Sequence, residues 1–236
     1  MENPLTLEEK VAVPRLIGHD LVSHYEDAFA VLAGVKKLSP EVLYAKNRHV
    51  RMTLAAITIL TTYTDDCYFG SVRSVELTSP TIPRLFDGNS KVEWFNQIKS
   101  DFIGSYPILY AALYNLIKNG FRAMDGKGVI RVSIDSFDKP SGDNLYGRPY
   151  GSLVYVPNWV SSSYTRFDVH DTGHGFPKDI PLEQNLALGV SGFRGGTGFG
   201  LHFVSLACKF LRAPLGIVSQ PGNTHVTIYH PTNLKK

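Results

Sequence analysis

Apolar residues recur at helical spacing through the first part of the chain, from about residue 12 to residue 37. The positions on this stripe are Val13, Leu16, Ile17, Leu21, Ala28, Val31, Leu32 and Val35. Ser39-Pro40 ends the pattern and is typical of the start of another helix, and a second stripe runs from about Glu41 to Tyr63. The pattern predicts an antiparallel helical hairpin. One hairpin has too little surface to bury both stripes, so we expect a homodimer in which two copies form a four-helix bundle.

From Gly70 onward the pattern changes to short segments separated by turn residues. It predicts helices at residues 106–123 and 201–211 and strands at residues 72–77, 129–136, 153–156, 164–170, 215–219 and 225–229. Residues 93–99 show no clear preference, and Pro221-Gly222-Asn223 predicts a hairpin turn between the last two strands. This order indicates an α+β chain, with a helical domain over residues 1–69 and an α/β sandwich with a mixed sheet over residues 70–236.

The composition is that of a folded protein, because 43% of the 236 residues are hydrophobic and 19% are charged. A net charge of +3 is too small to indicate nucleic acid binding. The charge is uneven: residues 1–70 carry 7 Lys and Arg against 9 Asp and Glu, whereas residues 71–236 carry 17 against 12. The positive excess of the second part suits a domain that binds an anionic nucleotide.

Neither the cysteines nor the hydropathy indicates an extracellular or membrane protein. Cys67 and Cys208 lie among apolar residues without zinc-ligand spacing, so we expect buried thiols rather than a disulfide. No apolar run approaches the roughly 18 residues that a membrane span needs. The N-terminus also lacks the pattern of a signal peptide. We therefore expect a cytoplasmic protein without a membrane partner.

Five glycines occur within nine residues between Gly192 and Gly200, directly before the apolar run that begins at Leu201. Glycine at this density indicates a backbone that approaches a ligand closely. A helix that follows such a loop directs its first N–H groups and its positive end toward a phosphate. Taken alone, the segment is also compatible with an ordinary turn.

Asn115 and Asn119 lie four residues apart in the helix expected at residues 106–123, so both amides share one face. A carboxamide oxygen is a suitable ligand for Mg²⁺ that is also bound to phosphates. Arg122, one turn further on, is placed to approach the same phosphates. A polar helix face in water remains the alternative for this pattern alone.

Asp171-Thr172-Gly173-His174-Gly175 directly follows the strand expected at residues 164–170. A buried carboxylate at a strand end can accept a hydrogen bond from the exocyclic amine of adenine. The two glycines would then let the purine ring lie against the backbone. Asp-X-Gly is also common in strand-end turns, which is the alternative for this segment alone.

Together, and in this order, the three segments resemble the N box (Asn115–Asn119), the G1 box (Asp171–Gly175) and the G2 box (Gly196-Thr197-Gly198-Phe199-Gly200-Leu201) of Bergerat-type ATPases. This family includes gyrase B, MutL and the sensor histidine kinases, which the order of the C-terminal elements resembles most. The resemblance covers about residues 70–231. It implies ATP and Mg²⁺ as cofactors, Asn119 as the metal ligand and Asn115 as a catalytic residue. The implied nucleotide-binding residues are Asn115, Asn119, Arg122, Asp171, Gly173, Gly175, Gly196, Thr197, Gly198, Gly200 and Leu201.

The chain departs from the family pattern at several places. Gly120 stands where alanine is usual, and Ala123 stands where an aromatic residue is common. The phenylalanine-bearing segment that usually lies between the G1 and G2 boxes is not evident in residues 177–190. Residues 138–163 resemble an insertion. We therefore expect a short or unusual nucleotide lid.

His19-Asp20-Leu21-Val22-Ser23 resembles the H box that carries the phosphoacceptor of histidine kinases, although its common proline is absent. Helical phase places His19 roughly 160° from the centre of the apolar stripe, facing solvent, and His24 about 20° from it, in the core. His49 lies on the flank of the second helix and is ambiguous. The resemblance implies that Asp20 orients His19 as general base, and that Ser23 positions water for dephosphorylation of a partner.

These expectations describe a protein-histidine kinase that autophosphorylates His19 and passes the phosphoryl group to an aspartate in a response-regulator receiver domain. The signal would come through a separate sensor partner, or the chain would be a fragment. Two alternatives remain open from the sequence. One is a phosphotransfer or scaffold protein with a degenerate nucleotide domain. The other is a Bergerat-type ATPase or a serine kinase of the anti-sigma kind, for which neither the hairpin nor His19 is needed.

Overall fold

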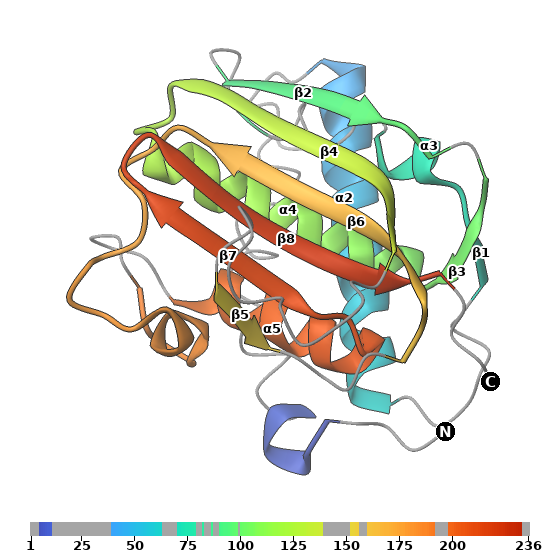
Figure 1. Ribbon diagram of the computed structural model, residues 1–236. Helices are drawn as coiled ribbons and strands as arrows, with labels where there is room; N and C mark the ends of the chain where they lie inside the picture. The colour runs from blue at the N-terminus through green and yellow to red at the C-terminus, as the bar shows by residue number, and fades with distance from the viewer. Residues whose placement is uncertain are drawn as a thin grey trace.

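The computed structural model describes residues 5–10, 39–62, 70–78, 82, 86, 90–98, 100–138, 152–155, 160–191 and 198–232. Its main feature is a six-stranded sheet in the order β2-β4-β6-β8-β7-β5 (Figure 1). β2 is parallel to β4, and all other neighbours are antiparallel, so the expected mixed sheet is confirmed. The strands are β2 (Ser90–Asn96), β4 (Gly128–Asp138), β5 (Ser152–Tyr155), β6 (Ser163–Asp171), β7 (Leu215–Gln220) and β8 (Asn223–Pro231).

Two helices, α4 (Tyr106–Ala123) and α5 (Phe199–Leu211), cover one face of this sheet (Figure 1). Alternate residues of the central strands point toward them, including Phe167 of β6 and Ile228 of β8, which are fully buried. The apolar stripes of the two helices complete one hydrophobic core. This arrangement confirms the expected α+β class and the α/β sandwich.

The bounds of α4 agree with those predicted from the sequence, for local reasons. Pro107 lies in the first turn, where its missing N–H costs nothing. The helix ends where Asp125 and Gly126 adopt positive φ angles of 52° and 73°. The Gly126 N–H then donates to the Phe121 carbonyl at 2.8 Å, which closes the last turn.

A third helix, α2 (Pro40–Thr62), packs against α4 on the side away from the sheet (Figure 1). It corresponds to the second helix of the predicted hairpin, which is confirmed as a helix. Its buried positions recur every three or four residues and include Ala45, His49, Thr53, Ala56 and Leu60. Since Ala56, Ile59 and Leu60 belong to the same core as α4, the core continues across the proposed domain boundary at residue 70. The first helix of the predicted hairpin lies outside the described residues.

The strand predicted at residues 72–77 is wrong. β1 (Gly70–Val72) is a short strand that pairs with β3 (Phe102–Gly104), and the chain then forms a helical turn, α3 (Ser74–Leu77). Glu76 forms an ion pair with Arg73 across this turn, and the Ser74 hydroxyl bonds the Ile98 carbonyl at 3.3 Å. In so short a segment, the apolar positions fit the period of a strand and the period of a helix equally well. The undecided residues 93–99 overlap the parallel edge strand β2.

The beginning of the chain contacts the sheet domain as well. Residues 7–10 form a helical turn, and Leu5 is buried in the core. The Lys209 ammonium of α5 donates to both carboxylate oxygens of Glu9 at 2.8 Å. Residues 200 positions apart in the sequence therefore hold this segment against α5.

Cys208 is a fully buried free thiol, as expected, and burial raises its pKa. Cys67 lies outside the described residues. Among the described helices, none combines the length and the apolar composition of a membrane span.

Candidate functional site

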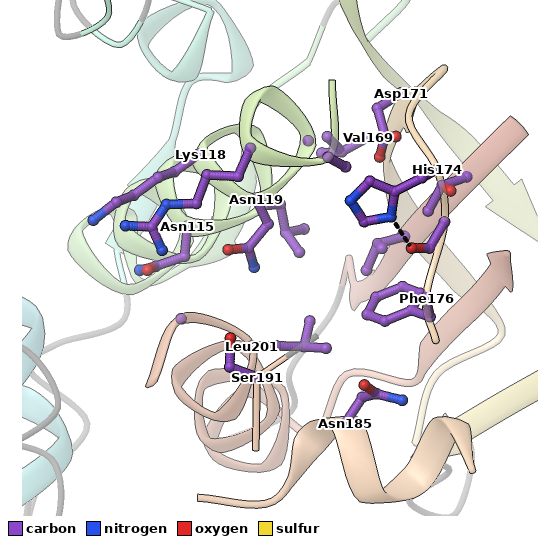
Figure 2. Close-up of a pocket in the computed structure, with 18 of the residues that line it drawn as sticks. Asn115, Lys118, Asn119, Val169, Asp171, His174, Phe176, Asn185, Ser191 and Leu201 are labelled. Carbon is purple, nitrogen blue, oxygen red and sulfur yellow. Dashed lines mark hydrogen bonds between the residues drawn. The ribbon is translucent and has the colours of Figure 1, made fainter. Parts of the chain in front are cut away.

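A pocket opens between α4, the end of β6 and the beginning of α5, and one face of α4 forms a wall of it (Figure 2). The polar residues of this wall are Asn115, Lys118, Asn119 and Arg122, which follow each other at helical spacing. The Asn115 amide nitrogen donates to the Ala111 carbonyl at 2.9 Å, so its oxygen is the atom left to accept from a ligand. The sequence reasoning identified all of these residues except Lys118, whose position three residues after Asn115 could have revealed it.

Asp171 lies at the end of β6 on the face of the sheet that α4 covers, and the residue is 6% exposed. Its Oδ1 accepts the Gly173 N–H at 2.8 Å. Burial raises the pKa of this carboxyl, against the opposing effect of that hydrogen bond. A buried acceptor at the base of a pocket is suited to bind an amino group.

Gly120 explains how Asp171 approaches α4 so closely. A Cβ on Gly120 would lie 2.5 Å from Ile130 Cδ1 and 3.2 Å from the Cβ of Asp171. Glycine therefore stands at this position, where alanine is usual in the family, because a side chain would collide with Ile130 and Asp171.

The two glycines after Asp171 hold their loop against its neighbours. A Cβ on Gly173 would lie 2.5 Å from the carbonyl oxygen of Ala123, at the end of α4. Gly175 has a φ of +77°, which disfavours any side chain. Gly175 lines the pocket, whereas Gly173 packs against Ala123 at the end of α4.

The β7–β8 hairpin fixes the same loop from the other side. The Gly222 N–H at the hairpin turn donates to the Gly173 carbonyl at 2.7 Å. The Ser219 hydroxyl accepts the Phe176 N–H at 2.7 Å. The turn predicted at residues 221–223 therefore has a second role, since it holds the pocket loop in place.

The start of α5 meets the amides of α4. Gly198 precedes the helix in the left-handed conformation, with φ +68°, and a Cβ there would lie 2.4 Å from the Gly189 carbonyl carbon. A Cβ on Gly200 would lie 3.0 Å from Asn115 Oδ1 and 3.4 Å from Asn119 Oδ1. Gly198, Gly200 and Leu201 all line the pocket. Two segments 80 residues apart in the sequence thus converge at one place.

Several expected residues lie outside the described part of the chain. These are Gly196 and Thr197 of the glycine-rich segment, and His19, Asp20 and Ser23. His24, on the same stretch, lies outside it too.

The pocket lining also includes residues that the sequence reasoning missed as ligands, among them His174, Phe176, Asn185 and Thr224. Thr224 pairs with Asp171 across β6 and β8, so both side chains point to the same face. Its hydroxyl is buried and has no hydrogen-bond partner among the described residues. The strand register could have identified Thr224. Asn185 comes from the 3₁₀ turn η3 (Leu182–Leu186), which no sequence motif indicated.

The pocket therefore has two chemically different ends. At one end a buried carboxylate and a hydroxyl, from Asp171 and Thr224, suit a base edge that offers both a donor and an acceptor. At the other end two amides, two cations and a helix N-terminus suit phosphates. Within the described residues, no cluster of three His, Cys, Asp or Glu side chains could hold a metal. The amide oxygens of Asn115 and Asn119 are compatible with a hard cation that phosphates also ligate.

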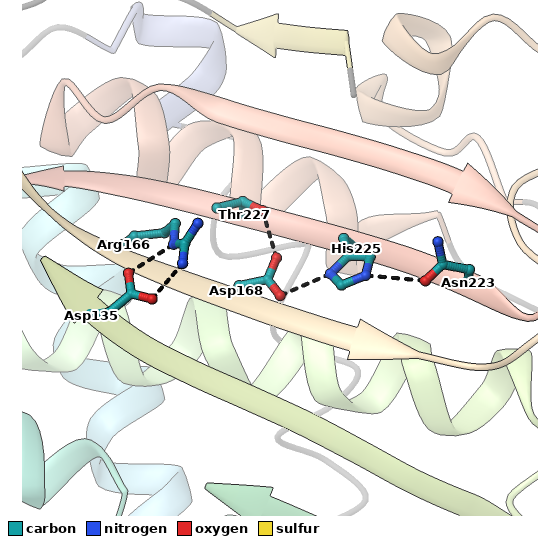
Figure 3. A network of polar contacts seen from close by, with 6 residues as sticks. All are labelled: Asp135, Arg166, Asp168, Asn223, His225 and Thr227. Carbon is teal, nitrogen blue, oxygen red and sulfur yellow. Dashed lines mark hydrogen bonds and ion pairs between the residues drawn. The ribbon is translucent and has the colours of Figure 1, made fainter. Parts of the chain in front are cut away.

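A second polar cluster lies on the opposite face of the sheet (Figure 3). Asp168 accepts from the Thr227 hydroxyl at 2.7 Å and from His225 Nδ1 at 2.8 Å. His225 Nε2 lies 3.2 Å from the Asn223 side-chain oxygen, to which it donates when the ring is protonated, and the hydrogen bond to Asp168 raises the His225 pKa. Arg166 binds Asp135 through two nitrogens. Because these groups bond one another across neighbouring strands, the cluster stabilises the sheet.

Comparison with known proteins agrees with this geometry. A family model described as "Histidine kinase-, DNA gyrase B-, and HSP90-like ATPase" matches residues 104–234. No curated relative matches the chain at the sequence level.

The solved structures that are similar to the chain include three of histidine kinases. Full-length ShkA in complex with AMPPNP is 16% identical with a TM-score of 0.51, and the match covers 96% of this chain but only 46% of that one. Acinetobacter baumannii histidine kinase AdeS is 14% identical, with a TM-score of 0.49 and coverage of 90% and 95%. The catalytic domain of histidine kinase ThkA is 15% identical, with a TM-score of 0.49 and coverage of 70% and 97%.

The likeness to ShkA supports the fold. The family match extends over more than half of the chain and includes every strand and helix that contributes to the pocket. The chain therefore belongs to the family of histidine kinase-, DNA gyrase B- and HSP90-like ATPases.

Proposed function

We propose that the chain is an ATP-dependent protein-histidine kinase of a two-component system. The observation that carries this proposal is the convergence of Asp171, the amides of α4 and the start of α5 on one pocket. A base-selecting end and a phosphate-selecting end within a single pocket match the two parts of ATP.

In this proposal the adenine amine donates to Asp171, and Thr224 donates to an acceptor on the same base edge. Lys118 and Arg122 attract the phosphate chain, and the N–H groups at the start of α5 bind its oxygens. Asn119, with Asn115, would hold Mg²⁺, which supplies charge neutralisation to the phosphates when bound. The protein contributes mainly by positioning the γ-phosphoryl group.

The proposed acceptor is His19. A ring nitrogen of neutral His19 forms a bond to the γ-phosphorus, while the bond from that phosphorus to the bridging oxygen breaks and ADP leaves. Asp20 would orient the ring through the other nitrogen and, as general base, accept its proton when the bond to phosphorus forms, and Ser23 would position water when a partner is dephosphorylated. His49, the next candidate from the sequence, is only 1% exposed and packs on Tyr114 of α4, which argues against it as the acceptor.

The partners belong to the same proposal. An aspartate of a response-regulator receiver domain would take the phosphoryl group from His19. The chain would act as a cytoplasmic homodimer through the hairpin, and a separate sensor would supply the signal. The first alternative, a phosphotransfer protein with a degenerate nucleotide site, is disfavoured because Asp171 and both amides face one pocket.

Incubation with γ-³²P-ATP and Mg²⁺, followed by acid and base treatment, tests the proposal. Label that is lost in acid and kept in base indicates phosphohistidine, and it should disappear in His19→Gln. Acid-stable label would favour the serine kinase alternative. Binding of ATP without any label on the protein would favour an ATPase.

A further inference from the structure

His174 stands on a backbone that is held on both sides. Its own N–H donates to the Ala123 carbonyl at 3.2 Å, and the Gly222 N–H donates to the carbonyl of Gly173. Beyond it, the Phe176 N–H donates to the Ser219 hydroxyl. The loop therefore presents the His174 side chain at a fixed place, where it is exposed and lines the pocket.

The orientation of the ring follows from one hydrogen bond. His174 Nδ1 lies 2.8 Å from the Gly175 carbonyl oxygen (Figure 2). A carbonyl oxygen only accepts, so Nδ1 carries the proton and, in the neutral imidazole, Nε2 carries the lone pair. Figure 2 shows the ring projecting from its loop into the pocket, toward α4. The nitrogen on that side is a hydrogen-bond acceptor.

The position lies near the base-binding end. His174 is three residues from Asp171, and both residues line the pocket. Within the described part of the chain, the other charged residues that line the pocket are Lys118 and Arg122 from α4. These cations are donors, so they do not compete with the ring for a donor on the ligand.

We propose that His174 determines the sugar specificity of the nucleotide site, with Nε2 accepting a hydrogen bond from a ribose hydroxyl. This inference rests on the proposed nucleotide binding and specifies it further. The sugar of a nucleotide offers two donors, the 2′- and 3′-hydroxyl groups, whereas the phosphates carry acceptors and Asp171 takes one N–H of the exocyclic amine. A ring nitrogen that accepts from one of these hydroxyls favours the ribonucleotide over the analogue that lacks that hydroxyl.

Affinities of ADP, 2′-deoxy-ADP and 3′-deoxy-ADP, measured by calorimetry without Mg²⁺, test this inference. The wild-type chain should bind ADP about three- to ten-fold more tightly than the analogue that lacks the contacted hydroxyl, the range for a neutral hydrogen bond. His174→Phe keeps a ring but removes both nitrogens, so it should bind ADP and that analogue equally. Thr172→Ala changes an exposed residue of the same loop outside the pocket lining, and it should keep the wild-type discrimination.

The outcomes separate this inference from the function on which it rests. If the wild-type chain binds all three nucleotides equally, or if a folded His174→Phe protein keeps the discrimination, His174 does not read the sugar. Adenine nucleotide binding then still stands. If the wild-type chain binds none of the three, the nucleotide site itself is overturned and the inference with it. Thermal unfolding of both variants verifies that they are folded.

Discussion

Asn115 and Gly200 approach so closely that a side chain on Gly200 would press on the amide: its Cβ would lie 3.0 Å from Asn115 Oδ1. The amide nitrogen of Asn115 is already bound to the Ala111 carbonyl, so the amide cannot turn freely away. The two motifs that carry these residues therefore constrain each other. The glycine gives α5 room to begin against the polar face of α4.

Gly200→Ala tests this relationship. The new Cβ should displace the amides of Asn115 and Asn119 and weaken Mg²⁺–ATP binding by several-fold. Alanine is a better helix former than glycine by about 1 kcal/mol, so the free energy of unfolding should stay equal or rise. Calorimetry and thermal unfolding measure the two quantities. Unchanged Mg²⁺–ATP affinity would show that the amides do not depend on this contact.

Asn119→Ala should remove a metal ligand while leaving the base-binding end intact. We expect the affinity for ADP without metal to change little, whereas the gain in affinity on adding Mg²⁺ should shrink by about ten-fold or more. Titrations of ADP with Mg²⁺ and with EDTA measure both values in one preparation. A variant that keeps the full Mg²⁺ effect would assign the metal to another residue.

Much of the fold was predictable because its long elements have strong periodicity. The bounds of α4 follow from its apolar stripe, Pro107 and the turn at Gly126. Residues 72–77 were mispredicted, because six residues with three apolar positions do not distinguish a strand from a helical turn, and the contact of Ser74 with Ile98 is not visible in the sequence.

The site was predictable to the extent that its residues lie in local motifs. Asp171 and the two asparagines were found in this way. Thr224 was missed because it reaches the pocket through strand pairing with Asp171. Asn185 was missed because the fold of residues 177–190 brings it there.

His49 should contribute to stability and not to phosphorylation. It is buried between α2 and α4, with its ring centroid 3.9 Å from that of Tyr114. His49→Gln replaces this ring contact with a buried amide and should lower the free energy of unfolding by about 1–3 kcal/mol. At a temperature where the variant is folded, its labelling by γ-³²P-ATP should equal that of the wild-type chain. A folded His49→Gln protein without label would make His49 the acceptor.

Truncation tests how far the sheet domain depends on α2. Ile59 and Leu60 are 4% and 0% exposed within the shared core, and burial of each contributes about 1.5–3 kcal/mol. Residues 39–236 should therefore remain folded, whereas residues 71–236 should unfold at a clearly lower temperature or aggregate. Thermal unfolding and light scattering compare the two. Equal stability would show that the domain starting at residue 70 is independent of α2.

Asp171→Asn should separate stability from binding. An amide at this place presents a donor to the donor amine of adenine, and an unmatched polar contact costs about 1–3 kcal/mol, or roughly 5- to 150-fold in ATP affinity. Asp168→Asn is the matched control, since it removes the same charge from the same strand on the other face. It should bind ATP as the wild-type chain does.

The pH dependence of Asp171 has a defined sign. Burial raises its pKa in the folded state, so the ionised carboxylate costs stability at neutral pH, and this cost disappears as the pH falls through the raised value. Without nucleotide, Asp171→Asn should therefore unfold at an equal or higher temperature than the wild-type chain near pH 7.

The amine of adenine binds the ionised form of Asp171, so wild-type ATP affinity should fall as the pH decreases through the same range. Calorimetric titrations at a series of pH values from neutral to acid measure this. If the ATP affinity of the wild-type chain does not change with pH, this carboxylate does not bind the base. The same conclusion follows if the affinity of Asp171→Asn falls as much as that of the wild-type chain when the pH decreases.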